Sequence, residues 1–236
     1  AEAFPTACHA LPSPVMSGPG TGLTKHFFFP GFTTGTGGLL REPDLRVRQA
    51  QFNRHTWLAQ HGVRNTDQRV VSLFCYEPTG LDELLNTLAA DTQPSCLLVT
   101  TGRASAAVHA EIARNDALHP LWNKRKALTF VYLSALTHAD FDHLLWSCDL
   151  NFVRGEDSLV RAILAGQPFV WQIYPQDDNA HVSKLEAFLD WLDAPDSLRQ
   201  VHTRWNRGHG STAVDRLRNP QSTAAAPHDA MKRQFD

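Results

Sequence analysis

The sequence carries little net charge and no long run of charges of one sign. Among 236 residues, 22 Lys and Arg stand against 24 Asp and Glu, and the longest basic run is the three residues Lys124–Lys126. Nucleic acids and acidic membranes are bound by basic patches, so neither is an expected partner. An anionic ligand must therefore be recognised by a few local groups.

Cysteine is also scarce, and the residues that bind metals lack the usual spacings. The four cysteines are scattered and form no C-x-x-C pair, and the twelve histidines form no H-E-x-x-H motif. These absences argue against a disulfide framework and against a zinc site. We expect no metal cofactor, and a reducing cytoplasm is the expected location.

Long apolar runs are missing as well. No apolar stretch approaches the roughly 18 residues of a membrane span, and the N-terminus lacks the basic-then-apolar order of a signal peptide. With 42% hydrophobic and 19% charged residues, the composition is that of an ordinary globular protein. We expect a soluble protein that is neither exported nor embedded in a membrane.

The first segment is rich in turn-forming residues. Residues 1–26 contain repeated Pro, Gly and Ser and little periodicity, which is typical of an interdomain linker. Since the chain starts on such a linker, we expect it to be the second half of a larger protein. Phe27–Phe29 predict a strand before the glycine-rich Gly31–Gly38, and Asp44–Gly62 predict one helix.

Apolar strands then alternate with amphipathic helices. Strands are expected in "RVVSLFCY", "SCLLVTT", "LTFVYL" and the two apolar runs of "FVRGEDSLVRAILAGQPFVWQIY", with helices between them. This order predicts a doubly wound, Rossmann-like α/β domain over residues 27–192, whose ligand lies at the carboxyl ends of the parallel strands. The polar residues 193–236 are expected to be a weakly helical tail.

The turn "RGEDS" between a strand and a helix has two possible interpretations. Gly155 permits a sharp turn, Ser158 and the free N–H groups of the helix can hold phosphate oxygens, and Arg154 adds a cationic fork. Alternatively, Glu156 and Asp157 are acids that the helix dipole favours in any first turn. The motif alone leaves a ligand site and a plain helix cap equally open.

Aromatic residues lie near the same expected strand ends. Phe74 and Tyr76 are two residues apart and therefore face the same side, where one ring can stack on a base and the Tyr76 hydroxyl can reach a phosphate. Filling the sheet face is the alternative role for both rings, and Phe141 has the same ambiguity. A polar loop, Pro175–Asp178, follows the last strand.

Three blocks of the sequence resemble the EarP family of protein-arginine rhamnosyltransferases. They are "FFFPGFTTGTGGLLREPDL", "SLFCYEP" and the long "FDHLLWSCDLNFVRGEDSLVRAILAGQPFVWQIYPQDDNAHVSKLEAFLD". The resemblance covers roughly residues 8–192 and implies the linker and C-terminal domain of a two-domain GT-B glycosyltransferase. The family's N-terminal domain, with the Asp assigned as general base, is not matched.

The resemblance implies inverting, metal-independent transfer of L-rhamnose from dTDP-β-L-rhamnose to an arginine of elongation factor P (EF-P). It assigns Glu156 to catalysis and implies the donor-binding residues Phe74, Tyr76, His138, Phe141, Arg154, Gly155, Asp157 and Ser158. Ala135 and His138 depart from the family pattern, which has an aromatic residue and a Gln there. Without an acceptor half we expect this chain alone to be inactive. The alternative function is a non-catalytic nucleotide-binding or EF-P-docking module.

Overall fold

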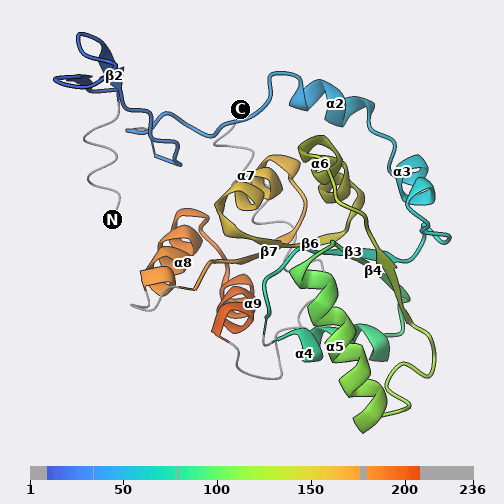
Figure 1. Ribbon diagram of the computed structural model, residues 1–236. Coiled ribbons are helices and arrows are strands. Elements are labelled where there is room, and N and C mark those ends of the chain that lie inside the picture. Colours follow the sequence, from blue (N-terminus) through green and yellow to red (C-terminus); the bar gives the residue numbers. More distant parts are fainter. Residues whose placement is uncertain (1–9, 34, 79, 176–179, 208–236) are drawn as a thin grey trace. The chain divides into compact units, whose positions relative to one another are not determined.

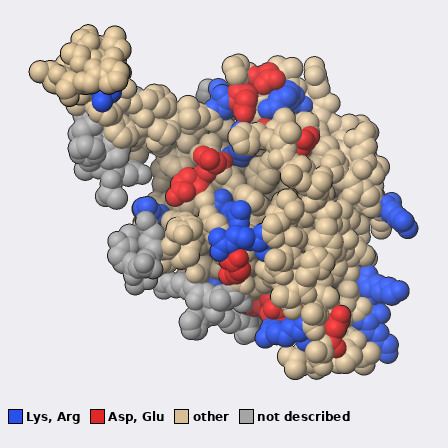
Figure 2. All heavy atoms as spheres, viewed as in Figure 1, with Lys and Arg blue, Asp and Glu red and all other residues tan. Residues whose placement is uncertain are grey.

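A computed structural model of the protein describes residues 10–33, 35–78, 80–175 and 180–207 (Figure 1). The chain divides into two compact units, Ala1–Ala50 and Gln51–Asp236. Among the described residues no helix has the length and apolar character that crossing a membrane requires. On the face shown in Figure 2, acidic and basic side chains are interspersed and form no basic stripe.

The first unit contains a short antiparallel hairpin. Strand β1 (Pro12–Pro14) pairs with β2 (Thr24–His26), and helix α2 spans Leu45–Gln51. The strand predicted at Phe27–Phe29 was wrong, since β2 ends at His26 and the rings of Phe27 and Phe28 are exposed. The Phe27 carbonyl still accepts a hydrogen bond from the Ala10 N–H at 2.7 Å, but Ala10 has a φ of +62°, which is not a strand conformation, so the ladder ends there.

The second unit is built on a sheet of five parallel strands. Their order is β5-β4-β3-β6-β7. The strands are β3 (Arg69–Leu73), β4 (Ser95–Val99), β5 (Leu128–Tyr132), β6 (Leu150–Arg154) and β7 (Phe169–Gln172). This topology confirms the doubly wound α/β fold that the sequence predicts.

Helices connect the strands, at positions close to those predicted. They are α3 (Arg54–Gln60), α4 (Leu81–Ala90), α5 (Arg103–Leu118), α6 (His138–Ser147), α7 (Gly155–Ala165), α8 (Ala180–Trp191) and α9 (Asp196–Arg207). The single helix predicted over Asp44–Gly62 is instead two helices, α2 and α3. Asn53 separates them because its side chain accepts a hydrogen bond from the Thr56 N–H and so begins a new helix.

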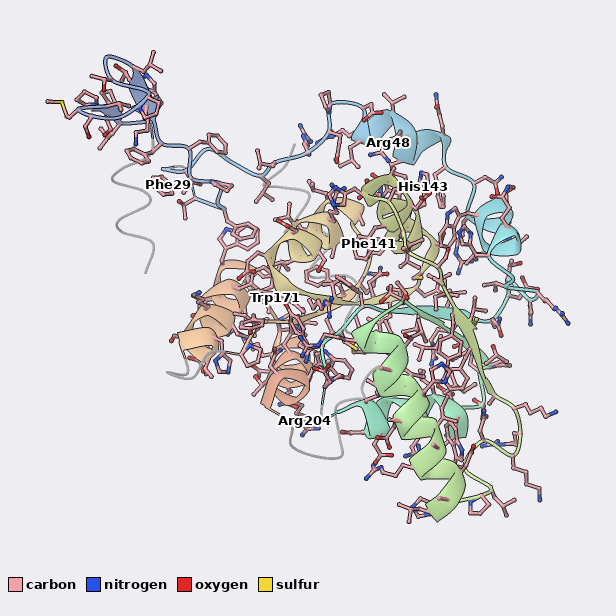
Figure 3. The ribbon with its side chains drawn as sticks, in the orientation of Figure 1. Phe29, Arg48, Phe141, His143, Trp171 and Arg204 are labelled. Atoms are coloured by element: carbon pink, nitrogen blue, oxygen red, sulfur yellow. The ribbon has the colours of Figure 1, made fainter. Side chains whose placement is uncertain are left out.

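Alternating strand residues pack on opposite faces of the sheet. Val71 and Leu97 lie in one core cluster with residues of α4, α5 and α9. Val70 and Leu98 lie in the other, with residues of α3 and α6. On β7, the Trp171 ring contacts Phe188 of α8, with the ring centroids 5.2 Å apart (Figure 3). The sheet is thus covered on both faces, which leaves its carboxyl edge for a ligand.

The described part of the expected tail is a packed helix. Val201 and Trp205 of α9 belong to the core cluster, and His202 is completely buried. Burial lowers the pKa of His202 to about 4. The boundary expected at residue 192 therefore falls inside the packed unit, and residues 208–236 lie outside the described part of the chain.

The strand order creates a switch point beside β3. From β3 the chain adds β4 and β5 on one side, then returns to place β6 and β7 on the other side. The loops after β3 and β6 therefore diverge at the carboxyl edge. Ligands of open α/β sheets bind in the crevice that such divergence leaves.

Candidate functional site

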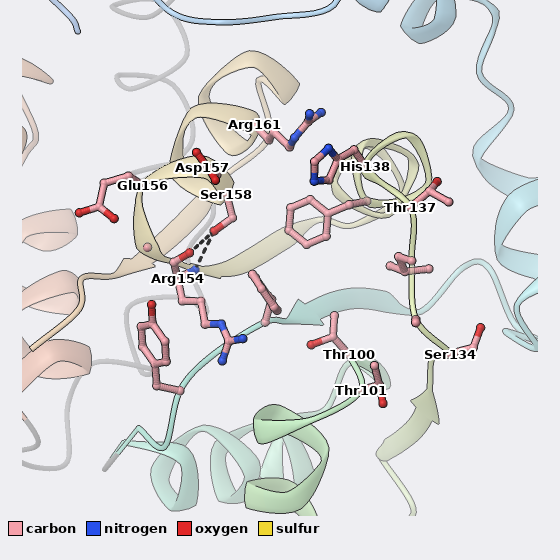
Figure 4. A pocket seen from close by; sticks show the side chains of 16 residues that line it. Thr100, Thr101, Ser134, Thr137, His138, Arg154, Glu156, Asp157, Ser158 and Arg161 are labelled. Carbon is pink, nitrogen blue, oxygen red and sulfur yellow. Dashed lines mark hydrogen bonds between the residues drawn. The ribbon is translucent and has the colours of Figure 1, made fainter. Parts of the chain in front are cut away.

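A cavity of about 590 Å³ opens at this switch point (Figure 4). That volume lies within the range of small-molecule sites, roughly 300 to 1,000 Å³. All of the residues predicted to bind or act on a ligand line it: Phe74, Tyr76, His138, Phe141, Arg154, Gly155, Glu156, Asp157 and Ser158. The structure thus brings together residues from three separate stretches of sequence.

Other lining residues were not predicted from the sequence. They are Thr100, Thr101, Ser134, Leu136, Thr137 and Arg161, beside Ala135. The signal for most of them was available, because they directly follow the ends of β4 and β5 at the predicted ligand edge. Arg161 lies three residues after Ser158, which places both on one side of α7.

Gly155 forms the junction between β6 and α7. Its φ of +66° is a conformation that residues with a Cβ rarely adopt, and an added Cβ would lie 3.3 Å from the Tyr76 hydroxyl. The indole N–H of Trp171 donates to the Gly155 carbonyl at 2.8 Å. The backbone at the start of α7 is therefore fixed, and the Tyr76 hydroxyl lies directly beside it.

The two helices that open on the cavity differ at their N-termini. The Thr137 hydroxyl caps α6, accepting a hydrogen bond from the Asp140 N–H at 3.1 Å. For α7, the N-cap residue is Arg154, whose side chain makes no capping bond. Glu156 and Asp157 are exposed, and within the described part of the chain neither carboxylate accepts a hydrogen bond. The first turn of α7 therefore matches an anion site better than a side-chain-capped end.

Ser158 uses its hydroxyl to close the same turn. The hydroxyl donates to the Arg154 carbonyl and accepts from the Arg154 N–H at 3.0 Å (Figure 4). A serine hydroxyl has only one hydrogen to donate, and here that hydrogen is used within the protein. In this arrangement Ser158 shapes the turn that a ligand would meet.

We expect Ser158→Ala to lower the free energy of unfolding by about 1 to 3 kcal/mol, because it removes the side-chain acceptor of the part-buried Arg154 N–H. Urea denaturation measures this change. Ser105, whose hydroxyl donates to the Gly102 carbonyl at 2.9 Å near the surface, provides the control. Ser105→Ala should change stability by less than about 0.5 kcal/mol. Equal losses in the two variants would contradict a structural role specific to Ser158.

Arg154 places a guanidinium group between aromatic rings. Its Cζ lies 4.3 Å from the centroid of the Phe74 ring and 4.6 Å from that of Tyr76. One N–H donates to the carbonyl of Cys75 at 2.9 Å. Arg154 forms no ion pair with any residue that the structure describes, so its positive charge is not neutralised locally. This cation is the group best placed to meet an anionic ligand.

Cys75, between the two ring residues, is buried and contributes no nucleophile. Burial raises the pKa of its thiol to about 12, although Arg154 opposes that rise. The thiol therefore stays protonated near neutral pH, and a thiolate mechanism does not fit this pocket.

The aromatic walls are held by edge-to-face contacts. The ring centroids of Phe74 and Phe141 are 5.3 Å apart, and those of Tyr76 and Tyr174 are 5.5 Å apart. The Tyr76 N–H donates to the Gln172 side chain at 2.8 Å, which fixes the loop after β3 to the end of β7. Phe74 and Tyr76 thus face one cavity, as their spacing predicts.

The α6 end of the cavity carries the two departures from the family pattern. Ala135 and His138 both line it, and His138 is the first residue of α6.

The polar loop expected at Pro175–Asp178 lies, apart from Pro175, outside the described residues. Among the residues that are described, no three or more His, Cys, Asp or Glu residues are grouped as a metal site requires.

The chain matches the family model described as the elongation factor P (EF-P) rhamnosyltransferase EarP over residues 1–235, beyond the 8–192 inferred from motifs. It is 47% identical to the protein-arginine rhamnosyltransferase of Pseudomonas putida, over 87% of this chain and 57% of the relative. For the Pseudomonas aeruginosa protein of the same name, identity is 42% over 89% of this chain and 58% of the relative.

A solved structure shares the fold. It is described as the structural basis for EarP-mediated arginine glycosylation of translation elongation factor EF-P. It aligns with a TM-score of 0.70 and 35% identity, over 88% of this chain and 70% of that chain. Compared with the two Pseudomonas relatives described above, the chain spans less than three fifths of their length.

Proposed function

The chain belongs to the EarP family of EF-P rhamnosyltransferases, and from this premise we propose that its pocket binds dTDP-β-L-rhamnose for transfer of the sugar to an arginine of EF-P. The observation that carries the proposal is the start of α7. There an N-terminus without a side-chain cap and the unneutralised Arg154 share one cavity with two aromatic side chains, Phe74 and Phe141. A nucleoside diphosphate has matching parts, an anionic diphosphate and a flat base.

In this proposal the diphosphate lies at the N-terminus of α7. The N–H groups that follow Gly155 and the guanidinium of Arg154 offset its negative charge. The base lies toward α6, whose residues Phe141 and His138 both line the cavity. Figure 4 shows His138 across the cavity from Arg154. Tyr76, beside Gly155, would reach the phosphates with its hydroxyl.

The proposed reaction forms a bond between an arginine nitrogen and the anomeric carbon while the bond from that carbon to the diphosphate breaks. Positive charge develops on the sugar, and negative charge grows on the leaving diphosphate. The guanidinium gives its proton to a base, for which the resemblance names an Asp of the family's N-terminal domain, a part of the relatives that this chain does not match. Arg154 and the α7 N-terminus supply charge for the leaving group, so the proposed transfer needs no metal. Glu156, exposed in the first turn of α7, would orient the cationic acceptor.

The alternative function is recognition without catalysis. Because the chain spans only 57–58% of the two Pseudomonas relatives, an EF-P-docking or nucleotide-binding module remains a second candidate for this chain alone. Under either function the chain by itself should show no multiple-turnover transfer to EF-P. A donor-binding domain without the acceptor-binding part cannot hold both substrates together.

Isothermal titration calorimetry tests the donor site directly. We expect the chain to bind dTDP saturably and with higher affinity than GDP, because the base lies in a confined aromatic cavity. UDP differs from dTDP in two ways: its base lacks the methyl group, and its ribose carries an additional hydroxyl. The affinity of UDP should be closer to that of dTDP than the affinity of GDP is.

Two results would contradict this proposal. One is the absence of saturable heat with dTDP, and the other is equal affinity for dTDP and GDP. The Gly155→Val variant is a control for site identity, since its side chain would collide with Tyr76 and strain the turn. If this variant is folded but binds dTDP as the parent does, the ligand lies elsewhere.

A further inference from the structure

A buried ion pair joins the two helices that form the upper wall of the cavity. One guanidinium nitrogen of Arg161 on α7 lies 2.8 Å from a carboxylate oxygen of Asp142 on α6. The Asp142 side chain is 3% exposed and that of Arg161 18% exposed. Arg161 lines the cavity, while Asp142 lies directly behind it, next in sequence to Phe141.

The position of the pair connects the two halves of the proposed ligand site. Asp142 follows the first turn of α6, which carries His138 and Phe141, and Arg161 follows the first turn of α7, which starts at Gly155. Figure 4 shows Arg161 next to His138 and on the far side of the cavity from Arg154. The pair is therefore nearer the base end of the site than the phosphate end.

The charge of Arg161 is already balanced by a buried carboxylate, in contrast to that of Arg154. A balanced pair adds little net potential for an anion. A buried guanidinium and carboxylate do, however, hold a defined relative geometry, because separating them leaves an uncompensated buried charge. Fixing the distance between α6 and α7 is the effect on the cavity that this pair can exert.

We propose that Asp142 and Arg161 are positioning residues that set the separation between the base end and the phosphate end of the donor site. This inference rests on the proposed function. Without the pair, the wall carrying His138 and Phe141 would shift relative to α7. Ligands that span both ends should then bind less tightly, while ligands that need only the α7 end should not.

The test compares dTDP with inorganic pyrophosphate on the same variants. Arg161→Met should weaken dTDP binding by about tenfold or more, the effect of a loosened supporting contact. Pyrophosphate, measured directly or by competition with dTDP, should keep its affinity within about twofold. Arg161→Lys should restore part of the dTDP affinity. Asp142→Asn should lose as much as Arg161→Met, and the double variant should lose no more, because both changes break one link.

A second ion pair serves as the matched control. Arg69 and Asp91 lie 2.9 Å apart with side chains 16% and 10% exposed, and Arg69 is at the amino end of β3, opposite the ligand edge. Arg69→Met should lower the melting temperature and leave dTDP affinity unchanged. If Arg161→Met and Arg69→Met act alike, the pair is only structural and the proposal is wrong. If the affinities for pyrophosphate and dTDP fall together, Arg161 contacts the phosphates directly. The proposed positioning role is then also wrong.

These outcomes can be separated from failure of the donor site itself. If the parent chain does not bind dTDP, the proposed function fails before any variant is compared. If the parent binds dTDP and either Arg161→Met or Asp142→Asn is folded by circular dichroism with unchanged affinity, only the positioning role is overturned.

Discussion

Replacing Arg154 with methionine is expected to weaken dTDP binding by about 10- to 100-fold, the loss for one or more hydrogen bonds to a charged group. Methionine keeps much of the length and apolar contact of the arginine stem but removes the charge. The guanidinium now lies 4.3 Å from the Phe74 ring centroid and 4.6 Å from that of Tyr76, and it has no described carboxylate partner. Calorimetry on the folded variant measures the change.

Two further variants, Arg154→Lys and Arg103→Met, test whether the loss of affinity is specific to the Arg154 guanidinium. Lysine keeps the charge but not the planar fork, so an intermediate affinity is expected. The Cζ of Arg103 also lies over the Tyr76 ring, at 4.9 Å, but Arg103 pairs with Glu77. Arg103→Met should therefore change dTDP affinity by less than about threefold, since its exposed ion pair is screened by solvent. Equal losses for Arg154→Met and Arg103→Met would indicate a general surface-charge effect.

Arg154→Met will also affect folding, which the binding assay must take into account. Its guanidinium donates to the carbonyl of Cys75, and the variant removes that bond. Binding should therefore be measured well below the melting temperature of the variant. A loss of affinity that disappears when the folded fraction is taken into account would remove Arg154 from the donor site.

The sheet could be predicted because the same sequence pattern recurs at each of its strands. Each of the strands β3 to β7 is a mostly apolar stretch of four or five residues, and each is buried or nearly so, apart from β5 at the sheet edge. Short apolar runs separated by amphipathic helices fit few arrangements other than a covered parallel sheet. The predicted helix at Leu81–Ala90 matches α4 at both ends, where Gly80 and Asp91 flank it.

The failures have local physical causes. Phe27 and Phe28 have strong strand propensity, but the partner chain leaves the strand conformation at Ala10, whose φ is +62°, so β2 ends at His26. In α9, the apolar residues are confined to a narrow stripe that includes Leu198, Val201 and Trp205, so its average composition is that of a polar tail. These residues have helical spacing, so the periodicity of residues 196–207 indicates a buried helix face that the average composition conceals.

The site was predictable where chemistry and backbone geometry coincide. A glycine at a strand end followed by a helix is a local signal, and the structure gives Gly155 the positive φ that this turn requires. Arg161 gives no such signal, because an arginine on the second turn of a helix is usually solvated. Its contact with Asp142 depends on how α6 and α7 pack, which links residues 19 positions apart.

The role of Glu156 depends on whether a first-turn acid does more than favour a helix start. Its carboxylate is exposed and accepts no hydrogen bond from a described residue, so no hydrogen bond of this carboxylate stabilises the described fold. Figure 4 shows it on the opposite side of the cavity from Thr137 and His138, away from the proposed base end. A carboxylate in that position is suited to a cationic acceptor approaching the sugar end of the donor.

Glu156→Ala is therefore expected to lower the rate of rhamnose transfer by roughly a hundredfold or more, as for loss of a positioned electrostatic group. Affinity for dTDP-rhamnose should stay within a few-fold of the parent, because removing a negative charge near the diphosphate does not weaken its binding. Transfer is measured under single-turnover conditions in a hybrid that joins this chain to the N-terminal portion of a full-length relative. Intact mass spectrometry of EF-P provides the readout.

The matched control is Asp196→Ala, which removes an exposed acid from the first turn of α9, outside the cavity. Both variants should lose about 0.3 to 1 kcal/mol of stability if each acid only offsets its helix dipole. Only Glu156→Ala should slow transfer, because of the two acids only Glu156 lines the cavity in which we propose that sugar and acceptor meet. If both hybrids transfer rhamnose at the parent rate, Glu156 serves the helix alone, and the carboxylate that orients the acceptor must come from another part of the enzyme.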